Sequence, residues 1–508
     1  MSEILTRDEY LAIAGDLHMP GDAFINGHFV PGASDKTFDS TNPATGELLG
    51  RVAVCEAADV DHAVAKAREA FDEGVWSKRH PSERKDVLIR LCKLIQRHRH
   101  ELAVLESLDS GKPISDCAVI DIPETIHTIS WHAETIDKLY DQVAPTGDDA
   151  LGLVVREPIG VVGCVLPWNF PLMMLAWKIG PALAAGNSVL VKPAEQTSLS
   201  TLRIAELALE AGIPAGVFNV VPGPGEITGE ALGMHDDIDM VSFTGSTVTG
   251  RRFLRYSADS NLKRIVLECG GKNPCVVLDD AGNLDVVADH VIESVFWNMG
   301  ENCSSNSRLI VDRGIKDALL ERIVQRARDW RTGDPLEPGN SLGAIVDREQ
   351  YDKVLDYIAS GKQEGATVIT GGGPLEQEDG LFIQPTIFDD VNPDMRIARE
   401  EIFGPVLAIV TVDGVDQALE TANDTPYGLT ASVFTTDVKR AHRAARAIRA
   451  GTVTVNCFGE GDISTPFGGY KQSGFGGRDN SIHAHDQYTE LKTIWLDLSD
   501  DRDRDPLD

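Results

Sequence analysis

Eight cysteines occur in the sequence, and Cys303 differs from most of the others in its surroundings. It lies in the polar stretch GENCSS (residues 300–305), between an apolar helical pattern at 291–299 and an apolar strand pattern at 309–311. Most other cysteines lie inside apolar runs, where a buried thiol packs as a small hydrophobic group. A thiol in a polar loop is a candidate nucleophile, with a structural loop cysteine as the alternative. The nearest histidine is His290, so a cysteine–histidine protease pair is not indicated.

Two further residues offer groups that a cysteine nucleophile needs. Glu268 ends an apolar strand pattern and precedes two glycines, so its carboxylate can act as a general base at a strand end. An ordinary strand-end acid is the alternative. Asn169 lies in PWNFP (residues 167–171), within the most apolar stretch of the chain. A buried amide needs partners or a substrate, and its NH2 group can donate to a developing oxyanion.

Apolar strand patterns alternating with helical patterns predict the elements that position these residues. Fully apolar strands in such an alternation are typical of a parallel sheet covered on both faces. The predicted fold class is α/β, with a doubly wound, Rossmann-type unit followed by a second α/β unit. The first unit has strand patterns at 160–166, 188–192, 217–221, 240–244 and 264–268. The second has them at 275–278, 307–311, 366–369, 407–410 and 452–456.

Ligands bind a doubly wound sheet at the carboxyl ends of its strands, and three segments there suit a nucleotide. The turn GPGEITG (223–229) is one residue too long for the usual dinucleotide fingerprint. Gly245 and Ser246 follow a strand and open a helix, whose free N–H groups can bind a phosphate, or they form a tight turn without a ligand. Lys192 and Glu195 can bind ribose hydroxyls, and a carboxylate favours NAD over NADP by repelling a 2'-phosphate. An exposed charged loop is the alternative.

The composition excludes several classes of protein. The chain has 508 residues, and 79 acidic against 47 basic residues give a formal net charge of -32. Such a surface repels nucleic acids and acidic membranes, so neither is expected as a partner. No C-x-x-C pair suggests a metal site, and no apolar segment suggests export, so a reducing, cytoplasmic location is expected. The apolar stretch 161–177 is interrupted by prolines and Asn169 and is interpreted as core, not as a membrane span.

Taken together, the motifs resemble the NAD(P)-dependent aldehyde dehydrogenase superfamily over nearly the whole chain. They are PWNFP (167–171), KPAE (192–195), FTGS (243–246), LECGGK (267–272), the loop around Cys303, EEIFGP (400–405) and PFGGYKQSG (466–474). The resemblance implies Cys303 as nucleophile, Glu268 as base and Asn169 as oxyanion donor, with no metal. It also implies a set of residues around the dinucleotide: Trp168, Lys192, Glu195, Gly225, Gly229, Phe243, Gly245, Ser246, Glu401 and Phe403.

The implied reaction is oxidation of an aldehyde to a carboxylic acid through a thiohemiacetal and a thioester on Cys303, with NAD as hydride acceptor. Glu268 separates the chain from the CoA-acylating members, which lack that base. The implied domains are a NAD-binding domain at 1–137 and 159–270, a catalytic domain at 271–484, and an oligomerisation segment at 138–158 and 485–508. A homodimer or homotetramer is expected. The tail at 488–497 alternates like a half-buried strand, and we expect it to pair with residues 151–156.

Within the superfamily the chain is most similar to the bacterial aminoaldehyde dehydrogenases of polyamine breakdown, particularly the gamma-glutamyl-gamma-aminobutyraldehyde type. This rests on DIP (121–123), AETIDK (133–138), GD (461–462) and ELKTIW (490–495). A cationic aminoaldehyde is expected to meet acids and aromatic rings, for which Asp121, Trp177 and Asp462 are the candidates. Semialdehyde, betaine-aldehyde and broad-specificity dehydrogenases remain alternatives, as do ester hydrolysis without redox chemistry and a structural protein on the same fold.

Two residues depart from the family pattern beside the catalytic positions. Glu301 stands where the family commonly has glutamine, and Cys269 replaces a leucine next to Glu268. If the Glu301 side chain faces Cys303, its negative charge is expected to raise the pKa of the thiol.

Overall fold

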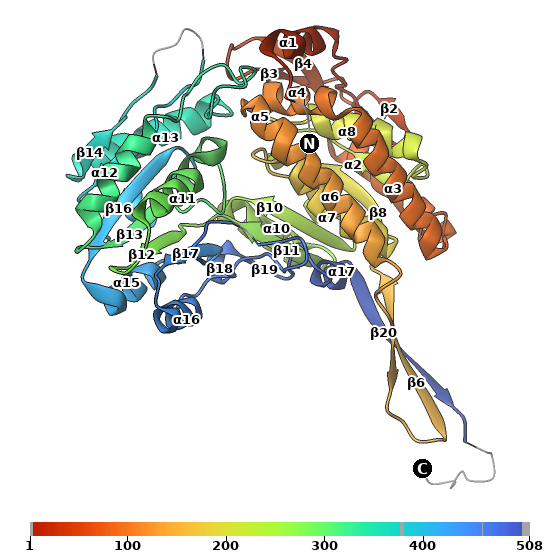
Figure 1. Ribbon diagram of the computed structural model, residues 1–508. Coiled ribbons are helices and arrows are strands. Elements are labelled where there is room, and N and C mark those ends of the chain that lie inside the picture. The colour runs from red at the N-terminus through yellow and green to blue at the C-terminus, as the bar shows by residue number, and fades with distance from the viewer. Residues whose placement is uncertain (1–3, 376–379, 460, 500–508) are drawn as a thin grey trace.

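The computed structural model describes residues 4–375, 380–459 and 461–499, which form two lobes and a projecting β-ribbon (Figure 1). An eight-stranded sheet organises the first lobe. In spatial order its strands are β19 (Gly474–Phe475), β11 (Arg264–Cys269), β10 (Met240–Gly245), β7 (Val161–Val165), β8 (Ser188–Lys192), β9 (Phe218–Val220), β1 (Ala23–Ile25) and β2 (His28–Val30). The five strands from β11 to β9 are parallel, whereas β19, β1 and β2 join the edges antiparallel.

The order of the parallel strands confirms the predicted doubly wound unit. The chain runs outward from β7 through β8 to β9 and then returns to the other side of β7 as β10 and β11. Strands β7 and β8 are buried at every position, which explains their continuous apolar sequences. The reversal of direction between β7 and β10 leaves a crevice at their carboxyl ends, where such sheets bind ligands.

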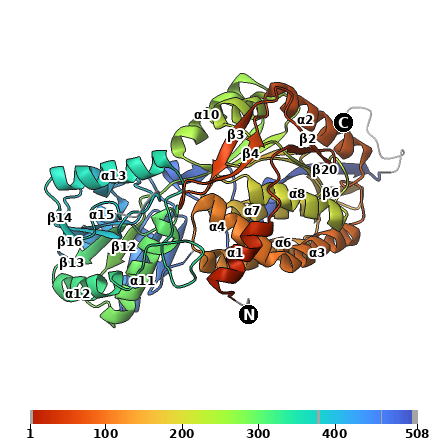
Figure 2. The same ribbon diagram turned by 90° about the horizontal axis from the view of Figure 1, so that it is seen from above.

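Helices cover both faces of this sheet (Figures 1 and 2). They are α1 (Arg7–Asp16), α2 (Ala57–Glu73), α3 (Pro81–Arg97), α4 (Arg99–Ser110), α5 (Ile114–Asp116), α6 (Ile122–Thr135), α7 (Pro171–Ala185), α8 (Leu199–Ala211), α9 (Glu230–Met234) and α10 (Thr247–Asp259). Two π-helical turns, η1 (Cys117–Asp121) and η2 (Gly225–Gly229), and a two-stranded hairpin of β3 (Thr37–Thr41) and β4 (Leu48–Ala53) complete the lobe.

Helix α7 carries most of the longest apolar stretch, and almost all of it is buried in the core. Pro171 stands in its first turn, where a fixed φ and a missing N–H group are tolerated. Gly186 ends the helix with a φ of 104°, a left-handed conformation that favours glycine. Of the helices in the part of the chain that the structure describes, none is long and apolar enough to cross a membrane.

A seven-stranded sheet organises the second lobe, and all its neighbouring pairs are parallel except β14 with β15. In spatial order its strands are β14 (Thr367–Thr370), β15 (Thr386–Asp389), β16 (Val406–Val412), β13 (Arg308–Asp312), β12 (Pro274–Val277), β17 (Thr430–Phe434) and β18 (Thr452–Val455). The sequence predicted five of these strands and missed β15 and β17. Both are short and contain Thr, Ser or Asp, so neither forms a continuous apolar run.

The helices of the second lobe lie on both sides of its sheet (Figure 2). They are α11 (Leu284–Phe296), α12 (Lys316–Ala327), α13 (Arg348–Gln363), α14 (Arg396–Arg399), α15 (Gly414–Asn423) and α16 (Val438–Ala447), with the 3₁₀ turns η3 (Trp297–Gly300) and η4 (Lys471–Ser473). Helix α17 (His483–Gln487) leads into the ribbon.

The ribbon is a three-stranded antiparallel sheet that projects from the first lobe (Figure 1). Its strands are β20 (Thr489–Asp497), β6 (Ala150–Pro158) and β5 (Gln142–Ala144). The register pairs Leu491 with Arg156 and Trp495 with Gly152, which confirms the predicted partner of the tail. The expected half-burial is wrong for the single chain, because β20 is exposed at nearly every position. Residues 500–508 lie outside the described residues.

Candidate active site

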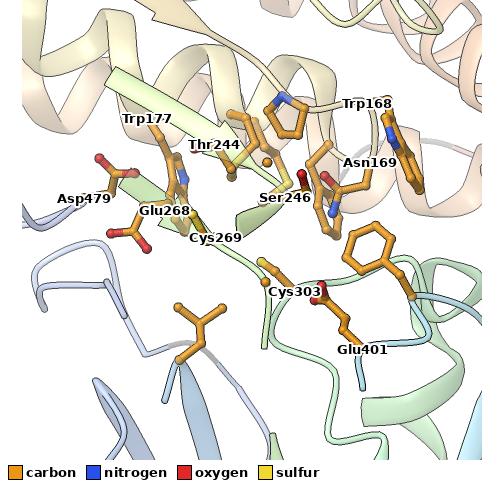
Figure 3. Close-up of a pocket in the computed structure, with 18 of the residues that line it drawn as sticks. Trp168, Asn169, Trp177, Thr244, Ser246, Glu268, Cys269, Cys303, Glu401 and Asp479 are labelled. Atoms are coloured by element: carbon orange, nitrogen blue, oxygen red, sulfur yellow. The ribbon is translucent and has the colours of Figure 1, made fainter. Parts of the chain in front are cut away.

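One cavity lies where the carboxyl ends of β7, β10 and β11 face the second lobe (Figure 3). The three residues that the sequence marked for chemistry all line it: Asn169 follows β7, Glu268 lies near the end of β11, and Cys303 comes from the second lobe. Asn169 and Glu268 are 99 positions apart in the chain, and Glu268 and Cys303 are 35 positions apart. All three nevertheless line the same cavity. The arrangement brings a thiol, a carboxyl and an amide donor together.

The Cys303 loop is held by its neighbours in an unusual backbone conformation. Asn298, Met299 and Gly300 have φ values of 53°, 56° and 69°, three left-handed residues in succession. Each non-glycine residue in that region costs roughly 1–3 kcal/mol, so the surrounding structure must enforce the conformation. The Asn302 Oδ1 atom accepts the backbone N–H of Ser304 at 2.9 Å, which forms a tight turn around Cys303.

A second amide, that of Asn273 directly before β12, holds the same loop within the second lobe. Asn273 Nδ2 donates to the carbonyl oxygen of Cys303 at 2.7 Å and to that of Ser305 at 3.1 Å. Its Oδ1 atom accepts the backbone N–H of Thr430, the first residue of β17. Asn273 thereby ties the Cys303 loop to the starts of β12 and β17.

Asn169 is buried, and its side chain is oriented by the same loop. Asn169 Nδ2 donates to the carbonyl oxygen of Glu301 at 2.9 Å. An amide nitrogen carries two hydrogens, so one remains for a group in the cavity. This geometry suits a donor to an oxyanion that forms at a carbon attached to Cys303.

Glu268 is buried at the other side of the cavity, beside Asp479 (Figure 3). In the described part of the chain neither of its carboxyl oxygens has a hydrogen-bond partner. Burial, and next the negative charge of Asp479, raise the pKa of Glu268 well above its ordinary value. Lys178 and Arg478 oppose this shift only in part. A carboxyl with a raised pKa suits proton transfer near neutral pH.

Asp479 also lines the cavity, although no motif in the sequence marks it. Its Oδ1 atom accepts from Gln487 Nε2 at 2.9 Å, whereas Oδ2 is buried without a partner in the described residues. It follows a glycine-rich segment without a strand or helix pattern, which reaches Glu268 through the pairing of β19 with β11 and through the bridge between Phe467 and Asp479. Lys178 is buried nearby and donates to Ser242 Oγ at 3.0 Å.

Aromatic and aliphatic side chains form the apolar end of the cavity. The rings of Trp177 and Phe467 lie with centroids 5.2 Å apart, and those of Phe170 and Trp297 are at the same separation. Trp177, which the sequence predicted as a substrate-lining residue, lines the cavity. Three aliphatic side chains complete this end: Met173, Met174 and Leu429.

The two acids predicted to line the substrate tunnel do not line the cavity. Asp121 is completely buried, and its Oδ2 atom pairs with Lys112 Nζ at 2.6 Å. Its role in this structure is to neutralise an interior lysine, so the prediction is corrected at this position. Asp462 is exposed, and its carboxylate accepts from the backbone and hydroxyl of Ser464. Asp462 is not among the residues that line the cavity.

The opposite end of the cavity has the groups that a dinucleotide requires. Trp168 and Phe403 meet edge to face with centroids 5.2 Å apart. Ser246 caps α10 and leaves the positive end of that helix toward the cavity. The Thr244 hydroxyl is buried without a partner in the described residues, and it lines the cavity. Glu401 Oε1 accepts the backbone N–H of Gly271 at 2.8 Å. These groups fit a phosphorylated, aromatic ligand.

The remaining predicted dinucleotide residues lie outside the cavity walls. Lys192 is buried and pairs with Glu195 at 3.1 Å at the end of β8. Gly229 lies beside the Lys192 side chain, because a β-carbon added there would approach Lys192 Cδ to 3.9 Å. Gly225 begins the turn η2. Phe243 packs into the core against Phe253, behind the cavity.

Gly245 and Gly270 lie where any side chain would collide with a neighbouring group. A β-carbon at Gly245 would press on the ring of Phe243, and one at Gly270 would collide with the Glu401 carboxylate. Both glycines line the cavity, so the backbone forms its wall there.

The departures at Glu301 and Cys269 have separate structural settings. The Glu301 carboxylate accepts the backbone N–H of Val346 at 3.2 Å and does not line the cavity, so it does not share that space with Cys303. Burial raises the pKa of Glu301 well above its ordinary value. Burial also raises the pKa of the Cys269 thiol to about 12, so this thiol is not a nucleophile at neutral pH.

Within the described residues, no cluster of three or more His, Cys, Asp or Glu side chains is arranged to hold a metal ion.

Residues 29–494 match the model of the aldehyde dehydrogenase family. The chain is 62% identical over 499 residues to the aminoacetaldehyde dehydrogenase of Pseudomonas aeruginosa, covering 98% of this chain and 100% of that protein.

Solved structures of aldehyde dehydrogenases are also similar to this chain. An indole-3-acetaldehyde dehydrogenase complexed with NAD+ superimposes with a TM-score of 0.96 at 51% identity, covering 97% of this chain and 100% of the other. The gamma-glutamyl-gamma-aminobutyraldehyde dehydrogenase of Burkholderia cenocepacia gives a TM-score of 0.95 at 50% identity, again with 97% and 100% covered.

Proposed function

The chain belongs to the aldehyde dehydrogenase family, and from this premise we propose that Cys303, Glu268 and Asn169 are its catalytic residues. The observation that carries the proposal is that one cavity contains all three side chains and continues from an apolar end to an end suited to a dinucleotide. The enzyme is an NAD(P)-dependent aldehyde dehydrogenase.

In the first half of the reaction the Cys303 thiolate attacks the carbonyl carbon of the aldehyde and forms a thiohemiacetal. The remaining N–H of Asn169 Nδ2 and the backbone N–H of Cys303 donate to the oxygen that becomes negative. Donors fixed in advance stabilise this charge more than they stabilise the neutral aldehyde. NAD, when bound, accepts the hydride that leaves the same carbon. Cys303 then carries a thioester.

In the second half Glu268 removes a proton from the water that attacks the thioester. The C–S bond then breaks, which releases the carboxylic acid and returns Cys303 as the thiolate that begins the next cycle, and Glu268 passes its proton to solvent. Its unpartnered oxygens support this role, because a carboxylate committed to a salt bridge would be a weaker base. The negative charge of Asp479 raises the pKa of Glu268, and a carboxylate with a higher pKa is a stronger base. Hydrolysis by Glu268 favours acid formation over transfer of the acyl group to CoA.

We propose that NAD binds between the carboxyl ends of β7 and β10. The NAD+ complex of the indole-3-acetaldehyde dehydrogenase supports this cofactor. Glu195 and Lys192 would bind the adenosine ribose, and the carboxylate disfavours NADP. The other residues assigned to the dinucleotide are Trp168, Gly225, Gly229, Phe243, Gly245, Ser246, Glu401 and Phe403.

The domain division follows the same proposal. Residues 1–137 and 159–270 would form the NAD-binding domain, 271–484 the catalytic domain, and 138–158 with 485–508 the oligomerisation segment. The separation of the two large sheets supports the first boundary. The exposed apolar side chains of the ribbon support a homodimer or homotetramer. Six buried cysteines that form no disulfide support a reducing, cytoplasmic location: Cys55, Cys92, Cys117, Cys164, Cys269 and Cys275.

We infer that the substrate is an aminoaldehyde, such as gamma-glutamyl-gamma-aminobutyraldehyde or aminoacetaldehyde. Two relatives that are named for these substrates support the inference. The rings of Phe170, Trp177, Trp297 and Phe467 offer faces to a cationic amine close to Cys303.

A panel of aldehydes with NAD and NADP tests the substrate. We expect kcat/KM to be highest for an aminoaldehyde with NAD, lower for an alkanal of equal length and lowest for succinic semialdehyde. A preference for the anionic semialdehyde would contradict a cationic substrate, and equal rates with NADP would contradict the role of Glu195.

A further inference from the structure

A buried amide outside the cavity connects the two parts of the proposed oxyanion site. Asn298 lies in η3, is 1% exposed and does not line the cavity. Its Nδ2 atom donates to the carbonyl oxygen of Asn169 at 3.0 Å and to that of Glu301 at 2.9 Å. Asn169 Nδ2 donates to the same Glu301 oxygen. One side chain therefore holds both the backbone of Asn169 and the carbonyl that orients the Asn169 amide.

The orientation of the Asn298 amide is fixed by chemistry. If the amide were reversed, its oxygen would face two carbonyl oxygens, and no hydrogen would lie between them. With the nitrogen facing them, the Oδ1 atom is buried without a partner in the described residues. A buried acceptor without a hydrogen-bond partner destabilises the folded state. The two hydrogen bonds that Nδ2 donates are therefore made at a cost in the free energy of unfolding.

The backbone at Asn298 serves the same geometry. Its φ of 53° and ψ of 40° begin the left-handed run that leads to Cys303, and asparagine tolerates this region better than most residues. The backbone N–H of Glu301 also donates to the carbonyl oxygen of Asn298 at 2.9 Å. Asn298 thus fixes the distance between Asn169 in the first lobe and Glu301 in the Cys303 loop.

We propose that Asn298 is a positioning residue for the oxyanion site. It holds the free N–H of Asn169 at the place where the oxygen of the thiohemiacetal forms on Cys303, and it never touches substrate. This inference rests on the proposed function. Its consequence is that Asn298 contributes to turnover only through Asn169 (Figure 3 shows Asn169 and Cys303 facing the same cavity).

A double-mutant cycle tests this with Asn298→Gly and Asn169→Ala in the full-length enzyme. Glycine keeps the left-handed backbone accessible and removes both donors. We expect Asn169→Ala to lower kcat roughly 10²–10³-fold, as loss of an oxyanion donor does. Asn298→Gly should lower kcat roughly 10²-fold, as a misplaced group does, with the aldehyde KM little changed. The double variant should match Asn169→Ala alone.

The matched control is Asn26→Gly, which changes an asparagine of the same φ, 53°, in the turn between β1 and β2. It should keep wild-type kcat. NAD binding by fluorescence and the melting temperature are measured on every variant, and both should stay near wild type for a positioning residue. If Asn298→Gly does not fold, Asn298→Asp replaces it, since aspartate keeps the shape and tolerates the left-handed region.

Each outcome decides a separate point. Wild-type kcat in Asn298→Gly, or a double variant that loses the product of both single factors, would overturn the positioning role while leaving Asn169 as donor. Wild-type kcat in Asn169→Ala would overturn the oxyanion proposal and the inference with it. Failure of both Asn298 variants to fold would make Asn298 a stability residue and would also overturn the inference.

Discussion

At the scale of single residues, the cavity divides chemistry between two lobes. The first lobe supplies Glu268 and Asn169 at the ends of parallel strands, and the second lobe supplies Cys303 on a strained loop. Hydrogen bonds from Asn273 fix that loop within the second lobe, and a hydrogen bond from Asn298 joins it to the carbonyl oxygen of Asn169 in the first lobe. The hydrogen bonds that position the Cys303 loop and the Asn169 amide therefore join backbone carbonyls to side-chain amides.

The raised pKa of Glu268 predicts the pH dependence of turnover. The carboxyl is protonated over a pH range in which an ordinary glutamate is ionised, and only the ionised form accepts a proton from water. Acid formation should therefore rise with pH as Glu268 loses its proton. Glu268→Gln should lower kcat roughly 10²–10⁴-fold and remove this rise.

The measurement is kcat between pH 6 and 10, with Glu321→Gln as the control because Glu321 is exposed on α12. The control should keep the wild-type profile. An unchanged rise with pH in Glu268→Gln would show that another group is the base.

At the scale of elements, a buried ion pair joins the end of α4 to η1 behind the cavity. Lys112 and Asp121 are 1% and 0% exposed with their charged atoms 2.6 Å apart, and Lys112 Nζ also lies 3.9 Å from the centroid of the Phe170 ring. Phe170 immediately precedes α7 and lines the cavity. The pair therefore supports the helix start that follows Asn169.

Removal of one partner should destabilise the protein strongly. Lys112→Met leaves the carboxylate of Asp121 buried and unpaired, which should cost about 3–5 kcal/mol in the free energy of unfolding. Lys36→Met is the matched control, because Lys36 and Glu56 are also 2.6 Å apart but 65% and 35% exposed. The control should cost about 0–1 kcal/mol. Urea unfolding measures both, and equal losses would contradict a structural role for the buried pair.

Most elements could be predicted from the sequence, and the exceptions have physical reasons. Strands such as β7 and β8 are apolar throughout because both faces are buried. Strand β17 was missed because its sequence includes small and polar residues. The buried Ser432 hydroxyl donates to Asn306 Oδ1 at 2.7 Å and lies 2.9 Å from Thr454 Oγ1, and the sequence does not reveal these partners.

The same limit applied to the candidate site. Motifs selected Cys303, Glu268 and Asn169, and the cavity contains all three. Asp121 was misplaced because the pattern could not show that Lys112 neutralises it in the interior. Asp479 and Asn298 were missed because their positions depend on tertiary pairing, although an asparagine before a glycine-containing turn is a signal for a left-handed residue.

At the scale of the whole molecule, the net charge of -32 and the exposed ribbon act in different ways. The charge favours solubility and the approach of a cationic aldehyde, whereas NAD must bind through local groups such as Lys192 and the start of α10. The ribbon instead presents apolar side chains, with Leu491 68% and Trp495 62% exposed. An exposed, extended apolar strand is typical of an interface.

The ribbon proposal predicts the oligomeric state. Leu491→Asp with Trp495→Asp should convert the oligomer to smaller species, because charges would be buried in the interface. Glu490→Gln, on the other face of β20, should leave the mass unchanged. Light scattering after size exclusion measures the mass, and a wild-type chain that is monomeric at micromolar concentration would contradict the proposal.

The central claim is that the acyl group forms on Cys303 and that Glu268 releases it. The most direct measurement is mass spectrometry of Glu268→Gln, quenched after mixing with aldehyde and NAD. We expect a burst of about one NADH per active site and an acyl group on the peptide that contains Cys303. Continued turnover at the wild-type rate, or an acyl group on any other residue, would contradict it.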